Sequence, residues 1–322
     1  MDNLGRQQVK RGHLAKLRTY PAVPIVVLLA VMFSLLSPYF ATAGNIEAMQ
    51  GANTVVLIAA IGMTFVFLVG GIDLSISTVI SASAVISALV MAQTDSVTLG
   101  VITAIAVGAA FGALNGVLIG YFKLTPFITT MATQLIARGI AFVLSQGIAV
   151  KGTPFALLDF GFVTLWHIPA VTLIGVGLCI VSAIVLRYSS WGRHVILVGS
   201  NPDAARFAGL SVPRIECSAY LLSGVLGGVA GFISIANLGN AIPGVGDTLL
   251  LIIIGAVVLG GTAMTGGEGS IERTILGVAL LSILTNGLNL VGIPFYDQLI
   301  IQGLLIFVGT WLATKFSGKR GV

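Results

Sequence analysis

Two charged residues in or beside long apolar segments are the first candidates for chemistry. Arg138 lies in T-Q-L-I-A-R-G-I-A-F, about three helical turns beyond Pro126. If that segment crosses a membrane, a guanidinium at such depth favours a functional role, and its planar fork supplies hydrogen-bond donors in a fixed geometry. We therefore predict that Arg138, with Gln134 and Thr130 of the same segment, lines a translocation path. The alternative is structural, with Arg138 bonded to carbonyls or hydroxyls inside a bundle.

Asp73, in V-G-G-I-D-L-S, is the second candidate. A carboxylate placed after Gly70 and Gly71 can cap a helix that begins at Leu74, because it accepts hydrogen bonds from the free N–H groups of the first turn. The sequence predicts this structural cap, with a functional role at membrane depth as the alternative. Acidic residues inside apolar segments are otherwise almost absent, which argues against a proton- or sodium-driven carrier.

The sequence contains no motif for enzyme chemistry. No phosphate-binding G-x-x-x-x-G-K-[ST] loop occurs, and the closest run, from Gly266 to Ser270, has no lysine. His13, His167 and His194 are far apart and have no carboxylate at metal-ligand spacing. We predict no catalytic residue, no metal site and no cofactor bound by this chain itself.

The composition specifies the environment of these residues. Of 322 residues, 57% are hydrophobic and 8% are charged, with a mean hydropathy of +1.06. So few charges cannot coat a soluble globule, and the pattern is typical of a polytopic membrane protein. The net charge of +5 is spread over short loops and the termini, which indicates a membrane surface rather than nucleic acid. Cys179 and Cys217 match no metal spacing and are interpreted as packing residues.

The predicted fold is all-α, with about ten transmembrane helices of roughly 20 residues each. The expected organisation is a tail at 1–20, six spans within 21–187, a polar passage at 188–214, four spans within 215–316, and a tail at 317–322. The region from Asn53 to Tyr121 also admits a broken helix. The ten segments are 21–40, 53–71, 75–93, 97–121, 126–145, 168–187, 215–236, 248–265, 274–291 and 297–315.

The basic residues predict the orientation. With an even number of spans and the N-terminus inside, nearly all Lys and Arg residues fall on one side, and only Lys151 falls on the other. The positive-inside rule then places both termini in the cytoplasm. The same layout puts five acidic residues outside: Glu47, Asp95, Asp159, Asp247 and Asp297.

Glycines at regular spacing predict close helix packing. Gly108, Gly112, Gly116 and Gly120 form one stripe, which lets another backbone approach closely, so this fourth span is expected to be interior. A similar face comprises Gly224, Gly227, Gly228 and Gly231. A weak internal similarity, L-V-G-G at 68–71 and V-L-G-G at 258–261, ends two spans at the same expected membrane face.

The passage from Arg187 to Arg214 contains a compact helix signal. Asn201 is the expected N-cap, Pro202 and Asp203 the first turn, and Gly209 the stop. A helix of about two turns does not persist alone in water, so it needs a surface to dock against. We expect Phe207 and Leu210 to share one face with Ala204. Either Phe207 enters a groove on a partner, or it packs against this chain's own helix ends.

Four stretches together resemble the permease subunit of ribose/xylose/arabinose-type sugar ABC importers. The resemblance covers nearly the whole chain after about residue 50. It departs from the family pattern in two places: I-S-T follows I-D-L-S, and I-E-R-T follows Gly269-Ser270. Glu272 and Arg273 are therefore expected to form either a local ion pair or a second contact with an ATPase. The stretches are G-M-T-F-V-F-L-V-G-G-I-D-L-S (62–75), W-G-R-H-V-I-L-V-G-S-N-P-D-A-A-R-F-A-G-L (191–210), A-V-V-L-G-G-T-A-M-T-G-G (256–267) and N-G-L-N-L-V-G (286–292).

The resemblance implies a multi-pass protein of the bacterial inner membrane. Two permease copies would form the path, a cytoplasmic ATPase would bind ATP and Mg²⁺, and a periplasmic or lipid-anchored binding protein would deliver a monosaccharide. The alternatives are a related permease for branched-chain amino acids or a furanosyl signalling molecule, and a stand-alone carrier or channel. The positions that match the family's coupling helix, which contacts the ATPase, are Asn201, Asp203, Ala204, Ala205, Arg206, Phe207 and Gly209.

Overall fold

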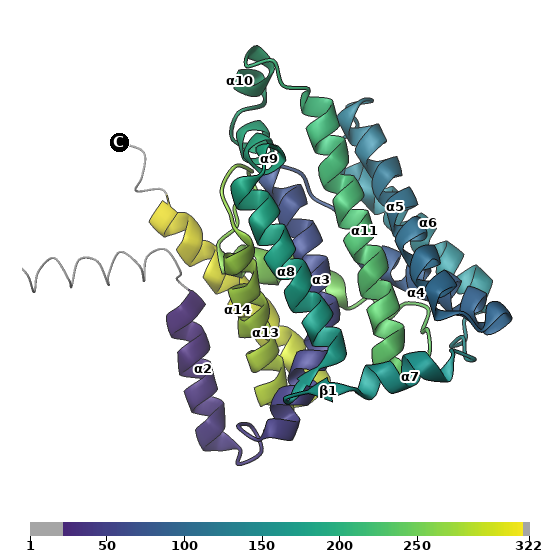
Figure 1. Ribbon diagram of the computed structural model, residues 1–322. Helices are drawn as coiled ribbons and strands as arrows, with labels where there is room; N and C mark the ends of the chain where they lie inside the picture. The colour runs from purple at the N-terminus through teal and green to yellow at the C-terminus, as the bar shows by residue number, and fades with distance from the viewer. Residues whose placement is uncertain (1–21, 318–322) are drawn as a thin grey trace, which may run out of the picture.

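The computed structural model describes residues 22–317, with side chains as far as Trp311. The predicted tail at 1–20, and all but the first residue of the one at 317–322, lie outside these residues. The described chain is a helical bundle with one short hairpin (Figure 1). Its elements are α2 (Ala22–Leu36), α3 (Ala43–Leu68), α4 (Ile76–Thr94), α5 (Val97–Gly120), α6 (Pro126–Ser145), α7 (Phe155–Phe162), β1 (Thr164–Leu165), β2 (Ile168–Pro169), α8 (Ala170–Tyr188), α9 (Ser190–Ser200), α10 (Pro202–Phe207), α11 (Val212–Leu238), α12 (Leu249–Gly260), α13 (Ile271–Leu290) and α14 (Phe295–Ser317).

Every predicted span overlaps one apolar helix. Among residues 22–317, seven helices are long and apolar enough to cross a membrane, and three shorter ones, Ala22–Leu36, Leu249–Gly260 and Phe295–Trp311, correspond to the remaining predicted segments. The all-α, polytopic fold class is confirmed, while a count of ten complete spans stays a prediction. The sequence interpretation did not include α7, the hairpin or α9 as separate elements.

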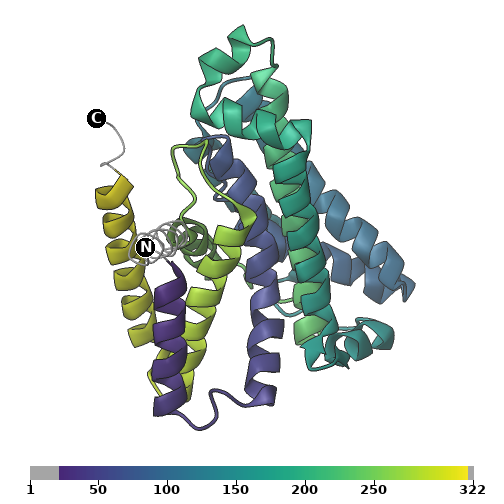
Figure 2. The same ribbon diagram turned by 60° about the vertical axis from the view of Figure 1, so that its left-hand side comes forward.

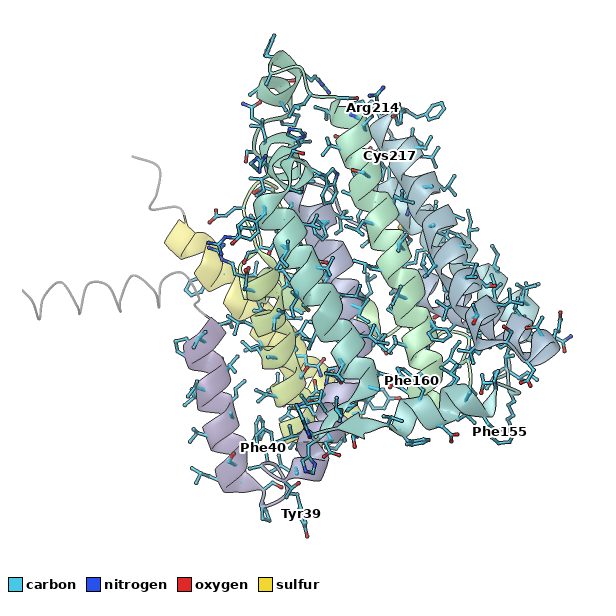
Figure 3. All side chains as sticks on the ribbon, in the orientation of Figure 1. Tyr39, Phe40, Phe155, Phe160, Arg214 and Cys217 are labelled. Atoms are coloured by element: carbon cyan, nitrogen blue, oxygen red, sulfur yellow. The ribbon has the colours of Figure 1, made fainter. Side chains whose placement is uncertain are left out.

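Helices α10 and α7 mark opposite ends of the bundle, called here the α10 end and the α7 end (Figure 1). Two views show α2, α13 and α14 on one side, α4, α5 and α6 on the other, and α3, α8 and α11 between them (Figure 2). In Figure 3, Arg214 and Cys217 lie near the α10 end of α11, whereas Tyr39, Phe40 and Phe155 lie toward the α7 end.

Helices α3 and α11 form the centre because small residues let their neighbours approach closely. A Cβ at Gly112, Gly116 or Gly120 of α5 would lie 2.5–2.7 Å from a carbonyl oxygen of α11. The predicted glycine stripes are therefore contact faces. The expectation that this fourth span is interior is wrong for the single chain, because the buried residues of α5 share one face and apolar side chains such as Ile102 are exposed.

Two irregular segments interrupt the helices inside the bundle. The first, residues 69–75, turns back from the α10 end, so that Ser75 reaches Asn115 of α5. The second, residues 239–248, enters from the α7 end, and the Gly246 N–H donates to Ser81 Oγ of α4 at 2.9 Å. Non-helical backbone is tolerated at membrane depth where protein surrounds it. The broken helix anticipated between Asn53 and Tyr121 is thus the junction of α3 and α4.

The two halves share an order of elements but run in opposite directions. In each half a long helix, α3 or α11, is followed by an irregular segment and three helices. Helix α3 ends at the α10 end and α11 begins there (Figure 1). L-V-G-G and V-L-G-G both lie at the α10 end, where the Gly267 N–H donates to the Leu68 carbonyl. L-V-G-G begins at the last residue of α3, whereas V-L-G-G runs through the end of α12. The two stretches therefore occupy different places in the two halves.

Candidate coupling surface and translocation path

Helix α10 forms as its capping residues predict. The Asn201 side chain accepts a hydrogen bond from the Ala204 N–H at 2.9 Å, Pro202 occupies the first helical position, and Gly209 has φ +81°. Ala205 is buried against Val198 of α9 and Val212 of α11. One face of this short helix is therefore fastened to the rest of the chain, which explains how six residues hold a helical conformation.

The opposite face of α10 presents Phe207 with a relative exposure of 93%. The interpretation in which this ring packs against the chain's own helix ends is wrong. The prediction that Leu210 shares a face with Phe207 is also wrong, because Leu210 packs with the buried Ala205 cluster instead. Arg206 lies 3.1 Å from Asp203 in an exposed ion pair, which contributes little stability on its own. The candidate coupling surface therefore consists of the exposed phenyl ring of Phe207 beside one acidic and one basic residue.

Helix α9, which sequence reasoning missed, anchors α10. Ser189 caps it, accepting from the Gly192 N–H at 2.9 Å. Trp191 donates to Ser218 Oγ of α11 at 2.7 Å, and its ring lies 5.3 Å from that of Phe65 on α3. The signals were present in the S-S-W start and in the spacing of apolar residues after it, but the surrounding arginines made the stretch resemble a loop.

A glycine junction joins α9 to the end of α3, where the first irregular segment begins, and to the loop after α12. A Cβ at Gly199 would overlap the Leu68 carbonyl oxygen at the end of α3. The Gly267 N–H donates to the same oxygen at 2.9 Å, and a Cβ at Gly266 would lie 2.9 Å from the Gly70 nitrogen. Backbone in direct contact cannot separate without a rearrangement of its neighbours. Displacement of α9 would therefore reach both α3 and the loop after α12.

One of the two charged residues that depart from the family pattern, Arg273, makes local contacts. Arg273 donates to the Gly261 carbonyl at 3.2 Å and lies 3.8 Å from Glu268. The structure thus supports the local interpretation for Arg273, although its partner is Glu268 and not Glu272. Glu272 is exposed in the first turn of α13, and its contact with an ATPase stays a prediction.

Asp73 is fully enclosed where the two halves meet. One carboxylate oxygen accepts from the Ser75 N–H at 3.0 Å and from the Ser75 hydroxyl at 2.6 Å. The other accepts from Ser223 of α11 at 2.8 Å. The predicted cap of a helix at Leu74 is wrong in position, because α4 begins at Ile76 with Ser75 as its N-cap, and Asp73 bonds to Ser75 in the turn before the helix. Sequence reasoning did not foresee the bond to α11.

The buried network continues to α5 and α6. Asn115 donates to Ser75 Oγ, and Thr133 donates to Asn115 Oδ1, both at 2.8 Å. Thr130 is buried and bonds to the Pro126 carbonyl at 2.8 Å and the Ile72 carbonyl at 3.4 Å. The structure therefore places Thr130 in helix packing, about two turns before Arg138 on α6.

Arg138 of α6 forms an ion pair with Asp247 of the second irregular segment. The ion pair is 2.9 Å long, with side-chain exposures of 53% and 26%. Asp247, expected outside the membrane, instead lies beside Gly246, which contacts Ser77 and Ser81 of α4. Gln134, one turn before Arg138, is half-buried. Charged side chains at membrane depth face a bundle interior or water, so this surface is a candidate path.

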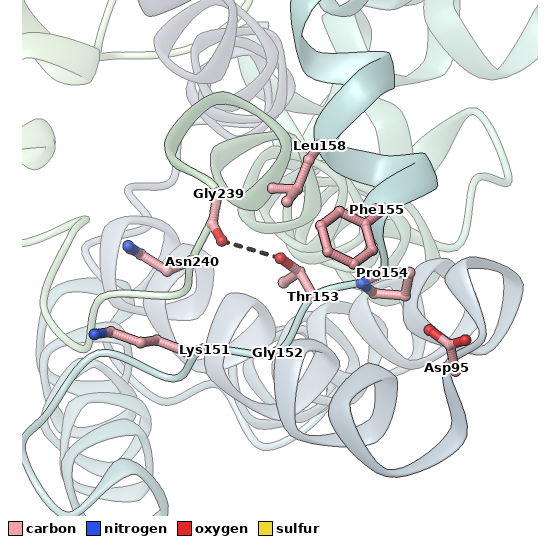
Figure 4. Close-up of a pocket in the computed structure, with 9 residues that line it drawn as sticks. All are labelled: Asp95, Lys151, Gly152, Thr153, Pro154, Phe155, Leu158, Gly239 and Asn240. Carbon is pink, nitrogen blue, oxygen red and sulfur yellow. Dashed lines mark hydrogen bonds between the residues drawn. The ribbon is translucent and has the colours of Figure 1, made fainter.

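A pocket of about 470 Å³ opens at the α7 end, between the loop before α7 and the end of α11 (Figure 4). Thr153 donates to the Gly239 carbonyl at 3.0 Å across it (Figure 4). It therefore lies where the second irregular segment begins. Its lining residues are Asp95, Lys151, Gly152, Thr153, Pro154, Phe155, Leu158, Gly239 and Asn240.

Comparison with known proteins identifies the family. Residues 45–309 match the family model described as the permease component of the branched-chain amino acid transport system. This chain belongs to that permease family. It is a multi-pass inner-membrane permease. Within residues 22–317, no group of three His, Cys, Asp or Glu side chains could hold a metal ion.

Several curated relatives align along most of this permease. It is 34% identical over 298 residues to the ribose import permease protein RbsC of Escherichia coli (strain K12), covering 91% of this chain and 92% of the relative. It is 35% identical over 293 residues to RbsC of Bacillus subtilis (strain 168), covering 90% and 91%. The D-allose transport system permease protein AlsC of Escherichia coli (strain K12) is 32% identical over 290 residues, covering 89% of each chain. No solved structure matches the permease significantly.

Proposed function

We propose that this chain is the permease subunit of an ATP-driven importer that moves a monosaccharide, most simply a ribose-like pentose. The observation that carries the ATP-driven part is Phe207, which is 93% exposed on a capped helix that is fastened at its other face. An exposed phenyl ring at the end of a membrane bundle favours burial in a partner. Relatives named for ribose, allose and arabinose transport support a sugar as cargo.

The proposed assembly contains two copies of the permease, a cytoplasmic ATPase subunit that binds ATP and Mg²⁺, and a periplasmic or lipid-anchored sugar-binding protein. The α10 end and both tails face the cytoplasm, and the α7 end faces the binding protein. Phe207 enters a groove on the ATPase, and the glycine junction passes the motion to α3 and to the loop after α12. Arg138 and Gln134 line the path.

A single charge on the coupling surface tests this proposal. Phe207→Asp should leave the permease inserted in the membrane, abolish capture of the ATPase and reduce uptake to background. Phe162→Asp is the matched control, because Phe162 is 81% exposed at the α7 end; it should retain the ATPase. If Phe207→Asp still captures the ATPase and transports at the unmodified rate, α10 is not the coupling element.

Orientation and energy supply have separate tests. A cysteine at Lys151 should react with an impermeant thiol reagent added to intact cells, whereas one at Arg193 should not. In liposomes, uptake should require the ATPase subunit and ATP. Uptake by the lone permease under a proton or sodium gradient would instead make it a secondary carrier.

The cargo is tested through the binding protein. Co-purification of the permease with its binding protein, followed by mass identification of the bound ligand, should give a pentose or a related monosaccharide. A branched-chain amino acid in that protein would support the second candidate, which the description of the matched family favours.

A further inference from the structure

We infer that Arg138, Asp247 and Phe142 form a transient subsite for a neutral sugar at mid-membrane. This inference rests on the proposed function and deepens it. Arg138 and Phe142 lie one turn apart on α6, and Asp247 lies near the end of the second irregular segment, just before α12. The three side chains therefore come from the two halves of the molecule and meet just before α12 begins.

The hydrogen-bonding capacity of the ion pair is only partly used. Arg138 Nη2 lies 2.9 Å from Asp247 Oδ2, whereas Asp247 Oδ1 is buried with no hydrogen-bond partner among the described residues. A guanidinium carries five N–H donors, and a carboxylate accepts at both oxygens. The half-exposed guanidinium thus retains free donors, whereas the unpartnered oxygen of Asp247 is enclosed. Sugar hydroxyls can accept hydrogen bonds from these donors.

The pair adjoins an aromatic ring. The Arg138 guanidinium lies 5.7 Å from the centroid of Phe142, and Phe142 is 37% exposed. Gly244 packs against both Asp247 and Phe142, because a Cβ there would lie 3.1 Å from Asp247 Oδ2 and 3.2 Å from the Phe142 ring. An apolar surface beside a few convergent polar groups is the usual composition of a small-molecule site. The C–H face of a sugar ring can pack on the phenyl ring.

The exposure and net charge of the pair point to a neutral, transient ligand. Arg138 is 53% exposed, so lipid or the path must cover it, and the cost of placing a charge against lipid favours the path. The pair as a whole is neutral and would not retain an ion. One half-buried carboxylate and one guanidinium offer few bonds, which suits a site that sugar must leave quickly.

Cysteine protection tests the subsite directly. Gln134→Cys, made in a chain with Cys179 and Cys217 replaced by alanine, places a thiol one turn from Arg138. In the complete complex in proteoliposomes, D-ribose, L-arabinose or D-allose should slow modification by a small polar thiol reagent at least threefold. Adding Asp247→Asn should remove that protection. Ile148→Cys, at an exposed position just beyond the α7-side end of α6, should show no protection and serves as the control.

Several outcomes would overturn the subsite. These are equal labelling rates with and without sugar, protection that survives Asp247→Asn, protection by L-leucine but by none of the sugars, or a disulfide between the introduced cysteines of two Gln134→Cys copies, which would mark a subunit contact. Arg138→Lys keeps the charge but loses the planar fork and should lower uptake on the order of tenfold, with ATPase capture unchanged. Because capture and ATP-dependent uptake are measured in the same complex, failure of the subsite and failure of the proposed function remain distinguishable.

Discussion

In the first irregular segment both carboxylate oxygens of Asp73 accept hydrogen bonds, from Ser75 and from Ser223. In the second, one oxygen of Asp247 pairs with Arg138 and the other has no partner among the described residues. Asp73 is 1% exposed, whereas the side chain of Asp247 is 26% exposed. A buried polar group is tolerated only when it is hydrogen-bonded. The first segment is thus built as an anchor, and the second retains unused bonding capacity.

The same contrast extends to the neighbours of each segment. The network of Asp73 continues through Asn115 to Thr133 and so joins α4, α5, α6 and α11. The second segment contacts α4 closely at one point, where Gly246 meets Ser77 and Ser81. Stability should therefore depend on many side chains around the first segment. Around the second it should depend on backbone contacts, at Gly246 and between Ala241 and Val150, and on few side chains.

Gly246→Ala should have the largest effect. A Cβ at this position would overlap the Ser77 carbonyl oxygen, and backbone cannot rotate away as a side chain can. We expect loss of the folded protein, measured as loss of the monodisperse peak in detergent. Gly177→Ala on α8 is the control, because nothing lies within 4 Å of the added carbon. Equal behaviour of the two variants would show that the second segment is not packed against α4.

Asp73→Ala should follow in size. It leaves the Ser75 N–H and two hydroxyls without their acceptor, and unpaired buried donors each cost about 1–3 kcal/mol. We expect the free energy of unfolding in mixed micelles to fall by about 3 kcal/mol or more. Asp159→Ala, in the exposed part of α7, should change it little. A small loss for Asp73→Ala would mean that the network is not an anchor.

The elements of the fold that were predictable have strong local signals. Apolar runs indicated the spans, and Asn201, Pro202 and Gly209 indicated α10, because capping depends on neighbouring residues. The path of the second irregular segment was not predictable. Its residues A-I-P-G-V-G-D-T are typical of an external loop, and the contacts that hold them in the bundle, such as that of Gly246 with α4, are made with distant parts of the chain.

The residues of the candidate site were also predictable only in part. Arg138 was identified because a charge inside an apolar helix is conspicuous, and Asp73 because it follows two glycines. Asp247 was assigned to the outer side, since charge counting does not detect a loop that re-enters the bundle. The bond between Asp73 and Ser223 joins residues 150 positions apart, and no pattern within one segment indicates such a contact.

Ser223→Ala removes a single bond of the anchor and should have a smaller effect. Asp73 loses one of its donors, at a cost of about 1–2 kcal/mol in the free energy of unfolding. Ser83→Ala is the matched control: Ser83 is equally buried on α4, but its hydroxyl has no partner among the described residues. Chemical unfolding in micelles should separate the two variants, and equal losses would show that the Ser223 bond adds nothing.

Asp247→Ala should have the smallest effect on stability. Its half-exposed ion pair is worth about 1 kcal/mol or less, and its removal also releases a buried oxygen that has no partner among the described residues. Arg138→Ala combined with Asp247→Ala should give a coupling energy below about 1 kcal/mol in a double-mutant cycle. The corresponding cycle for Asp73 and Ser223 should give more, because that bond is fully enclosed. If Asp247→Ala destabilises the protein as much as Asp73→Ala, the second segment is also an anchor, and the bonding capacity assigned to sugar is needed to hold the fold.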